Sequence, residues 1–132
     1  MKKTRQPGIR FDRVFLSKMK YDLPKMPPDK FSYKLNFINA YKIQKEGLIY
    51  TMTVQLYDRF EFEVTGIFST IKGQENLSLE KFAKVNAPAL LLPFIREIIS
   101  NITSRTPLPY LLLPPINVFA LTKKSKAGKT SK

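Results

Sequence analysis

Residues 86–121 read NAPALLLPFIREIISNITSRTPLPYLLLPPINVFAL, and this stretch decides the fold. It contains the longest apolar runs of the chain and six of its ten prolines. Asn86 is the expected N-cap of a helix, with Pro88 in its first turn. Pro93 predicts a kink or a start nearer Leu92. The proline-rich sequence that follows the helix ends it, so the residues beyond are expected to be extended.

Four segments before this stretch alternate apolar and polar residues, which is the period of half-buried strands. They are residues 9–21, 31–43, 48–56 and 60–68. In the first segment, Phe15 falls on the same apolar parity as the other large apolar residues Ile9, Phe11, Met19 and Tyr21. Short links between the later segments favour an antiparallel arrangement with one apolar face. The sequence therefore predicts an α+β fold, a four-stranded antiparallel meander covered by one long C-terminal helix.

One helix covers only part of a four-stranded sheet, so self-association is expected. The predicted helix carries a broad apolar stripe at helical spacing. We assign this stripe to an oligomer interface, and it comprises Leu91, Leu92, Ile95, Ile99 and Ile102.

The amino-acid composition limits the catalytic, redox and metal-binding chemistry that the chain can perform. The chain has no cysteine and no histidine, so it lacks disulfides, thiol chemistry, the commonest general base and the commonest metal ligand. No apolar run approaches the ~20 residues that span a bilayer, and the basic residues 1–10 are not followed by the apolar core of a signal peptide. We expect a cytoplasmic protein that is not an enzyme, with no catalytic residues, no cofactor and no metal site.

The formal net charge of +13 is concentrated at the two ends of the chain. Residues 1–10 and 123–132 together supply nine of these charges and contain no acidic residue. We expect a flexible basic N-terminus over residues 1–8, one domain over residues 9–121 and a disordered lysine-rich tail over residues 122–132. Such tails are solvated extensions more often than nucleic-acid-binding arms. Nucleic acid is therefore not an expected partner.

Several motifs resemble the SecB family of bacterial export chaperones. Residues 88–97, PALLLPFIRE, are similar to the helix motif P-x-x-L-F-P-Y-x-R-E of that family, and residues 115–121, PINVFAL, resemble its P-V-N-F-x-A-L. Residues 66–69, GIFS, match the end of its fourth strand, and residues 21–24, YDLP, resemble the end of its first strand. The matches follow the family order and cover most of the predicted domain.

The resemblance implies a four-stranded antiparallel sheet with a long helix, assembled as a homotetramer built from two dimers. It also implies an ATP-independent holdase that keeps precursors unfolded for export and passes them to the SecA motor. A holdase needs wide apolar and aromatic surfaces and no catalytic groups, which agrees with this composition. Two alternatives remain open: a SecB-like chaperone dedicated to one client such as an antitoxin, and a basic adaptor that binds nucleic acid or ribosomes.

Candidate residues for a client-binding groove come from two parts of the chain. By the resemblance, Tyr33, Leu35 and Phe37 border the groove, although the same face could simply pack on the helix. The extended segment after the helix has little other reason to be apolar. Its groove or interface candidates are Leu111, Leu113, Phe119 and Leu121.

The resemblance also implies a docking face for SecA on the exposed side of the sheet. Asp22 and Glu61 occupy two acidic positions of that face, but Lys18 stands where a third acid is usual, which weakens complementarity to a cationic partner. After Leu121 the family continues into a second amphipathic helix and an acidic tail, whereas this chain continues into lysines. The groove is therefore expected to be closed differently.

Overall fold

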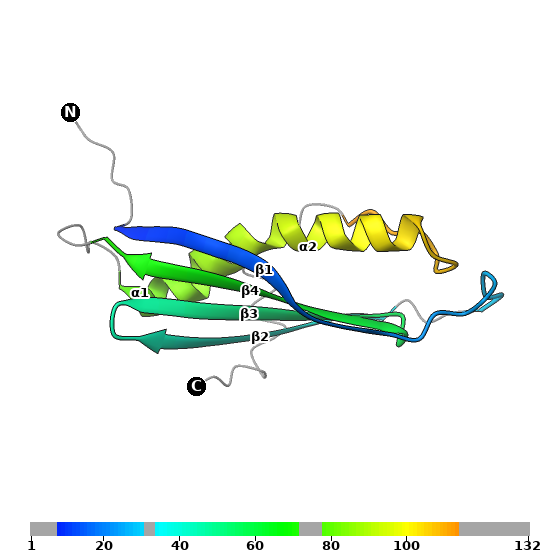
Figure 1. Ribbon diagram of the computed structural model, residues 1–132, viewed down its shortest axis with the longest axis horizontal. Coiled ribbons are helices and arrows are strands. Elements are labelled where there is room, and N and C mark those ends of the chain that lie inside the picture. The colour runs from blue at the N-terminus through cyan, green and yellow to red at the C-terminus, as the bar shows by residue number, and fades with distance from the viewer. Residues whose placement is uncertain (1–7, 31–33, 72–77, 114–132) are drawn as a thin grey trace, which may run out of the picture.

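The computed structural model describes residues 8–30, 34–71 and 78–113. A four-stranded antiparallel sheet carries a long C-terminal helix, α2, on one face (Figure 1). The strands are β1 (Ile9–Tyr21), β2 (Leu35–Gln44), β3 (Gly47–Leu56) and β4 (Phe60–Thr70). This architecture confirms the predicted α+β fold and the bounds predicted for the first strand.

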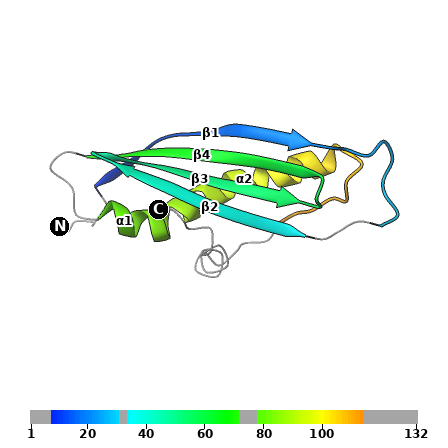
Figure 2. The ribbon, with the colours of Figure 1, turned by 90° about the horizontal axis from the view of Figure 1, so that it is seen from below.

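The strand order is β1-β4-β3-β2, so β1 and β2 form the two edges of the sheet (Figure 2). Strands β2, β3 and β4 follow one another as hairpins, but β1 pairs with β4. The predicted meander therefore holds for three strands only, and the whole sheet has a Greek-key order. Prolines in the connection after β1 cannot donate to a strand ladder, which favours a long crossing over a tight hairpin.

Two bulges in β1 overturn the predicted position of Phe15. The register against β4 shifts at Asp12 and again at Ser17, and each extra residue exchanges the faces of the sheet. Phe15 consequently pairs with Thr65 and lies on the outer face, away from α2. There the guanidinium of Arg13 lies 5.2 Å from the centre of its ring.

Both bulge residues are short and polar, and their side chains bind groups on the outer face. Asp12 accepts a hydrogen bond from Arg10 at 2.8 Å. The Ser17 hydroxyl lies 2.7 Å from a carboxylate oxygen of Glu63 and 2.7 Å from the hydroxyl of Thr65. These contacts stabilise an extra polar residue on the outer face at each bulge. Simple alternation of apolar and polar residues does not predict such bulges.

Helix α2 begins directly after Asn86, as predicted, and it continues a short helical run that precedes it. Ser78 caps it by accepting a hydrogen bond from the Lys81 N–H at 3.1 Å, and α1 (Leu79–Lys81) leads through a π-helical turn, η1 (Phe82–Asn86), into α2 (Ala87–Ser104). Asn86 makes no capping bond. The wider turn lies just before Pro88, whose ring would clash with a regular α turn. Pro93 lies inside α2 and does not end it.

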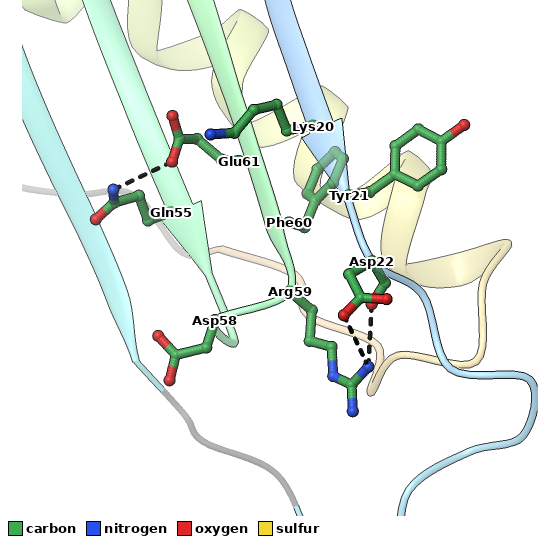
Figure 3. Close-up of a pocket in the computed structure, with 8 residues that line it drawn as sticks. All are labelled: Lys20, Tyr21, Asp22, Gln55, Asp58, Arg59, Phe60 and Glu61. Carbon is green, nitrogen blue, oxygen red and sulfur yellow. Dashed lines mark hydrogen bonds and ion pairs between the residues drawn. The ribbon is translucent and has the colours of Figure 1, made fainter.

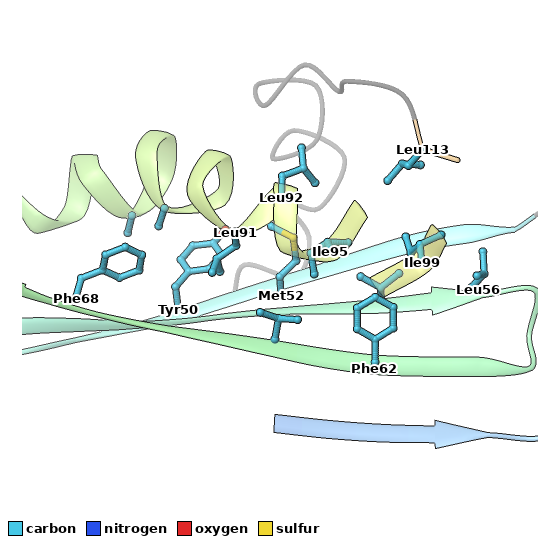
Figure 4. Packing of buried hydrophobic residues seen from close by; sticks show 14 of the residues in the cluster. Tyr50, Met52, Leu56, Phe62, Phe68, Leu91, Leu92, Ile95, Ile99 and Leu113 are labelled. Atoms are coloured by element: carbon cyan, nitrogen blue, oxygen red, sulfur yellow. The ribbon is translucent and has the colours of Figure 1, made fainter. Parts of the chain in front are cut away.

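The core lies between α2 and the two central strands (Figure 4). Leu91, Ile95 and Ile99 are 0% exposed and face the sheet. A Cβ atom on Gly66 would lie 2.8 Å from Leu91, so the glycine permits close approach of the helix to β4. The buried strand residues beneath α2 include Tyr50, Met52, Val54, Phe62 and Phe68.

This packing corrects the assignment of the helix stripe to an oligomer interface. Leu91, Ile95 and Ile99 have no surface left for a second subunit, and Leu92 is also buried. They form the core of the single chain, where each buried side chain stabilises the fold by roughly 1.5–3 kcal/mol. Ile102 is half-buried and packs against the same core.

Candidate functional site

Helix α2 packs on β3 and β4 and leaves the helix-facing sides of both edge strands less covered (Figure 2). On β1 these are the exposed residues Leu16, Met19 and Tyr21, which we call the β1 strip. On β2 they are Leu35, Phe37, Asn39, Tyr41 and Ile43, which we call the β2 strip. The two strips flank the helix on opposite sides.

The β2 strip contains two of the predicted groove residues. Leu35 and Phe37 pair in register with the buried residues Leu56 and Val54, so they face the helix side of the sheet. Both are half-buried and pack at the margin of the core. Tyr33, the third candidate on this strand, lies outside the described residues.

Tyr41 is held in a fixed position within the β2 strip. Its ring stacks on Tyr50, with ring centres 6.0 Å apart and planes 8° apart. Its hydroxyl donates a 3.0 Å hydrogen bond to the carboxylate of Glu80 on α1. Burial, together with Glu80, raises the pKa of the Tyr41 hydroxyl. The strip therefore presents an oriented, uncharged aromatic ring.

Asn39 lies between Phe37 and Tyr41 and is buried, with 7% of its surface exposed. Neither its Oδ1 nor its Nδ2 atom has a hydrogen-bond partner among the described residues. A buried carboxamide without partners is uncommon in folded proteins.

The segment after α2 runs back over the helix and is fixed at three points. The Leu111 N–H donates to the Thr103 hydroxyl at 3.0 Å, and Arg96 Nε donates to the Leu113 carbonyl oxygen at 2.9 Å. The Tyr57 hydroxyl donates to the Pro109 carbonyl oxygen at 3.2 Å. The roles of Arg96, Thr103 and Tyr57 were not foreseen from the sequence, because each depends on contacts between distant segments.

These contacts turn the alternate leucines of the segment in opposite directions. Leu113 is 4% exposed and belongs to the core. Leu111 is partly buried and packs against the same core. Leu113 is therefore a core residue rather than the groove residue predicted, while Tyr110 and Leu112 are the exposed members, Leu112 at 63%. Phe119 and Leu121, the remaining candidates, lie outside the described residues.

An exposed apolar surface continues from the β1 strip onto α2. Phe94 is exposed and contacts Phe11 of β1 edge to face, with ring centres 6.2 Å apart. Leu90 lies one turn earlier on the same side of the helix and is also exposed. Together with the β1 strip these side chains form an apolar surface that the rest of the described chain leaves uncovered.

Asp22 and Glu61, the predicted docking pair, do lie near each other. Both line an open pocket of about 400 Å³ on the outer face, at the end of the sheet where β3 turns into β4 (Figure 3). Arg59 donates to the Asp22 carbonyl oxygen at 3.1 Å and its guanidinium lies 3.7 Å from the Asp22 carboxylate. Glu61 accepts a hydrogen bond from Gln55 at 3.2 Å and lies 3.7 Å from the Lys18 ammonium.

Each carboxylate of this pair therefore has a cationic partner within the chain. Exposed ion pairs of this kind contribute little to stability, but a cationic protein that docks here must displace them. Among residues 8–30, 34–71 and 78–113 no cluster of acidic side chains could hold a metal ion. Within the same residues no helix is long and apolar enough to cross a membrane.

Comparison with known proteins identifies relatives across most of the chain. The family model described as "Preprotein translocase subunit SecB" matches residues 39–129. A protein-export protein SecB of Cellvibrio japonicus is 29% identical over 146 aligned positions, which cover 96% of this chain and 86% of that protein. A SecB of Anaplasma phagocytophilum is 37% identical over 70 positions, covering 51% of this chain but less than half, 44%, of the relative.

The fold has a counterpart among solved structures. A SecB-like chaperone of Mycobacterium tuberculosis, solved in complex with a ChAD peptide from the HigA1 antitoxin, superposes with a TM-score of 0.65. The match covers 83% of this chain and 91% of that chain at 18% sequence identity. At this identity the likeness establishes a shared fold.

Proposed function

The chain belongs to the SecB family, and from that premise we propose that it is an ATP-independent holdase that binds unfolded polypeptides beside α2. The observation that carries this proposal is the β2 strip, an apolar and aromatic surface that α2 leaves less covered. Extended apolar segments of a client are the chemistry that such a surface binds. The protein would act in the cytoplasm without catalysis or a cofactor.

The proposed chaperone works as a homo-oligomer. The apolar surface formed by the β1 strip, Phe94 and Leu90 borders an edge strand, and a second copy of the chain would remove it from water. A dimer formed there, and a tetramer built from two such dimers, would leave the β2 strip of every chain available to clients.

General export and service to one client are distinct versions of this proposal. The structural counterpart from Mycobacterium tuberculosis is bound to an antitoxin peptide, which favours a dedicated client as the second candidate. The internal pairing of Asp22 with Arg59 and of Glu61 with Lys18 points the same way, because it weakens a face that would otherwise attract SecA.

The first experiment combines solution mass with suppression of aggregation. The full-length chain is mixed with a slowly folding precursor in the absence of ATP, at near-stoichiometric ratios. An oligomer that suppresses aggregation supports the general holdase. An oligomer that protects no generic client, yet binds one cognate protein tightly, supports the dedicated chaperone. A chain that binds no unfolded polypeptide contradicts both versions.

A further inference from the structure

The segment after α2, residues 106–113, is rich in leucine and is neither helical nor part of the sheet. Leu108 and Leu113 are each 4% exposed and belong to the main buried cluster, and Leu111 packs against it. A stretch without secondary structure that buries apolar side chains beside α2 has the chemistry of the clients that a holdase binds. The segment therefore resembles a client that the chain itself supplies.

The backbone of this segment has few donors with which to hold it in place. Pro107 and Pro109 carry no N–H group. Two side chains of α2 fasten the far end of the segment, the Thr103 hydroxyl and the Arg96 guanidinium. Local opening costs least where backbone hydrogen bonds are few. Release of the segment therefore requires much less than unfolding of the sheet.

The turn between β3 and β4 fastens the near end of the segment. The Tyr57 hydroxyl donates to the Pro109 carbonyl oxygen at 3.2 Å. The Tyr57 backbone N–H donates to the carbonyl oxygen of Lys34 at 3.0 Å, directly before the β2 strip. One buried tyrosine thus joins the segment after α2 to the beginning of the β2 strip.

Tyr57 makes these contacts from an unfavourable backbone conformation. Tyr57 and Asp58 both have a φ angle of 58°. Two-residue turns of this kind favour asparagine and glycine, and a bulky side chain is disfavoured at positive φ. Tyrosine makes the turn itself less stable, and its bond to the segment after α2 gives a functional reason for its presence.

We propose that residues 106–113 are an autoinhibitory segment that occupies part of the client-binding surface beside α2, and that Tyr57 is its latch. An unfolded segment of another protein binds when residues 106–113 move away, and its apolar side chains take the places of Leu108 and Leu113. The apparent client affinity is then set by the fraction of chains in which this surface is free. This inference rests on the proposed holdase function.

The substitution Tyr57→Phe tests the latch, because it removes the hydroxyl and keeps the ring. Loss of this hydrogen bond should speed hydrogen exchange of the Leu111 amide by a factor of about two to ten. The affinity for a labelled, end-blocked peptide of alternating leucine and serine should rise by the same factor, because both depend on the same opening. A merely structural role of Tyr57 would lower stability without raising this affinity.

Arg96→Ala releases the other end of the segment and should act in the same direction, since Arg96 Nε donates to the Leu113 carbonyl oxygen at 2.9 Å. Glu97→Ala is the matched control, because Glu97 is the neighbouring exposed residue of α2. This variant should keep the exchange rates and the peptide affinity of the wild type.

Saturating the wild type with the peptide gives the direct test. Binding beside a docked segment would slow exchange of the Leu111 amide, whereas displacement of the segment should quicken it. Slower exchange on binding would overturn the autoinhibitory segment, and so would equal or lower peptide affinity in Tyr57→Phe. In either case binding by the wild type would still support the holdase. A wild type that binds no unfolded peptide removes the holdase and this inference together.

Discussion

At the scale of single residues, the hydroxyl of Thr103 joins α2 to the segment after it. Thr103 is buried, donates to the Ile99 carbonyl oxygen at 2.8 Å and accepts from the Leu111 N–H at 3.0 Å. Thr103→Val keeps the shape but leaves the Leu111 N–H without this partner, which should lower the free energy of unfolding by about 1–3 kcal/mol. Urea denaturation at fixed protein concentration measures the change. Thr53→Val, a control substitution on the outer face, should change the free energy of unfolding by less than about 0.5 kcal/mol. Equal losses in the two variants would contradict the role of Thr103.

The buried hydroxyl of Tyr50 makes stability depend on alkaline pH. Burial raises the pKa of Tyr50 far above its usual value of about 10. Because the folded chain holds this proton more tightly than the unfolded chain, the stabilisation is complete below about pH 10 and is lost as the pH rises further. The free energy of unfolding should therefore fall more steeply above pH 10 in the wild type than in Tyr50→Phe. If the free energy of unfolding falls with pH in parallel for the two proteins, Tyr50 does not contribute to this pH dependence. Tyr110→Phe, at an exposed tyrosine, is the control.

At the scale of elements, the segment after α2 is an extended layer that Arg96 ties to the helix through the Leu113 carbonyl oxygen. Arg96→Ala should release residues 106–113 locally, because a charge-assisted hydrogen bond is lost while the sheet core is unchanged. Hydrogen exchange should quicken in this segment by about tenfold and stay the same in β3 and β4. Glu97→Ala, at the neighbouring exposed position, serves as control. Faster exchange throughout α2 would contradict a local role for Arg96.

The sequence predicted elements well where each residue of an element obeys one period. The bounds of the first strand were predicted correctly. Leu35 and Phe37 were placed on the helix side because the register of β2 against β3 has no bulge. The register of β1 was not predictable, since its bulges depend on polar contacts with residues far away in the sequence. The burial of Leu113 likewise depends on Arg96, which alternation cannot reveal.

At the scale of the whole molecule, α2 packs on the two central strands, and the described residues cover the apolar margins at the two edge strands less completely. The margin at β1 is made of large, exposed residues next to a bulged edge strand, with Tyr21 64% exposed. The margin at β2 is half-buried, and its buried Asn39 carboxamide has no hydrogen-bond partner among the described residues. In the proposed function a second copy of the chain covers the margin at β1 permanently and clients bind transiently at β2, since a permanent interface favours a more apolar surface.

If the β1 strip forms the oligomer interface and the β2 strip binds clients, a charge in the β1 strip should dissociate the oligomer without abolishing client binding. Leu16→Glu would bury an unpaired carboxylate in the proposed interface, at a cost of about 3 kcal/mol or more, so self-association should weaken at least about a hundredfold. Ile38→Glu is the matched control, because Ile38 is similarly exposed but lies on the outer face of β2. Light scattering should give a smaller mass for Leu16→Glu and the wild-type mass for Ile38→Glu, with circular dichroism confirming that both variants are folded. If Ile38→Glu alone dissociates, the outer face is the interface and the assignment of the two margins must be abandoned.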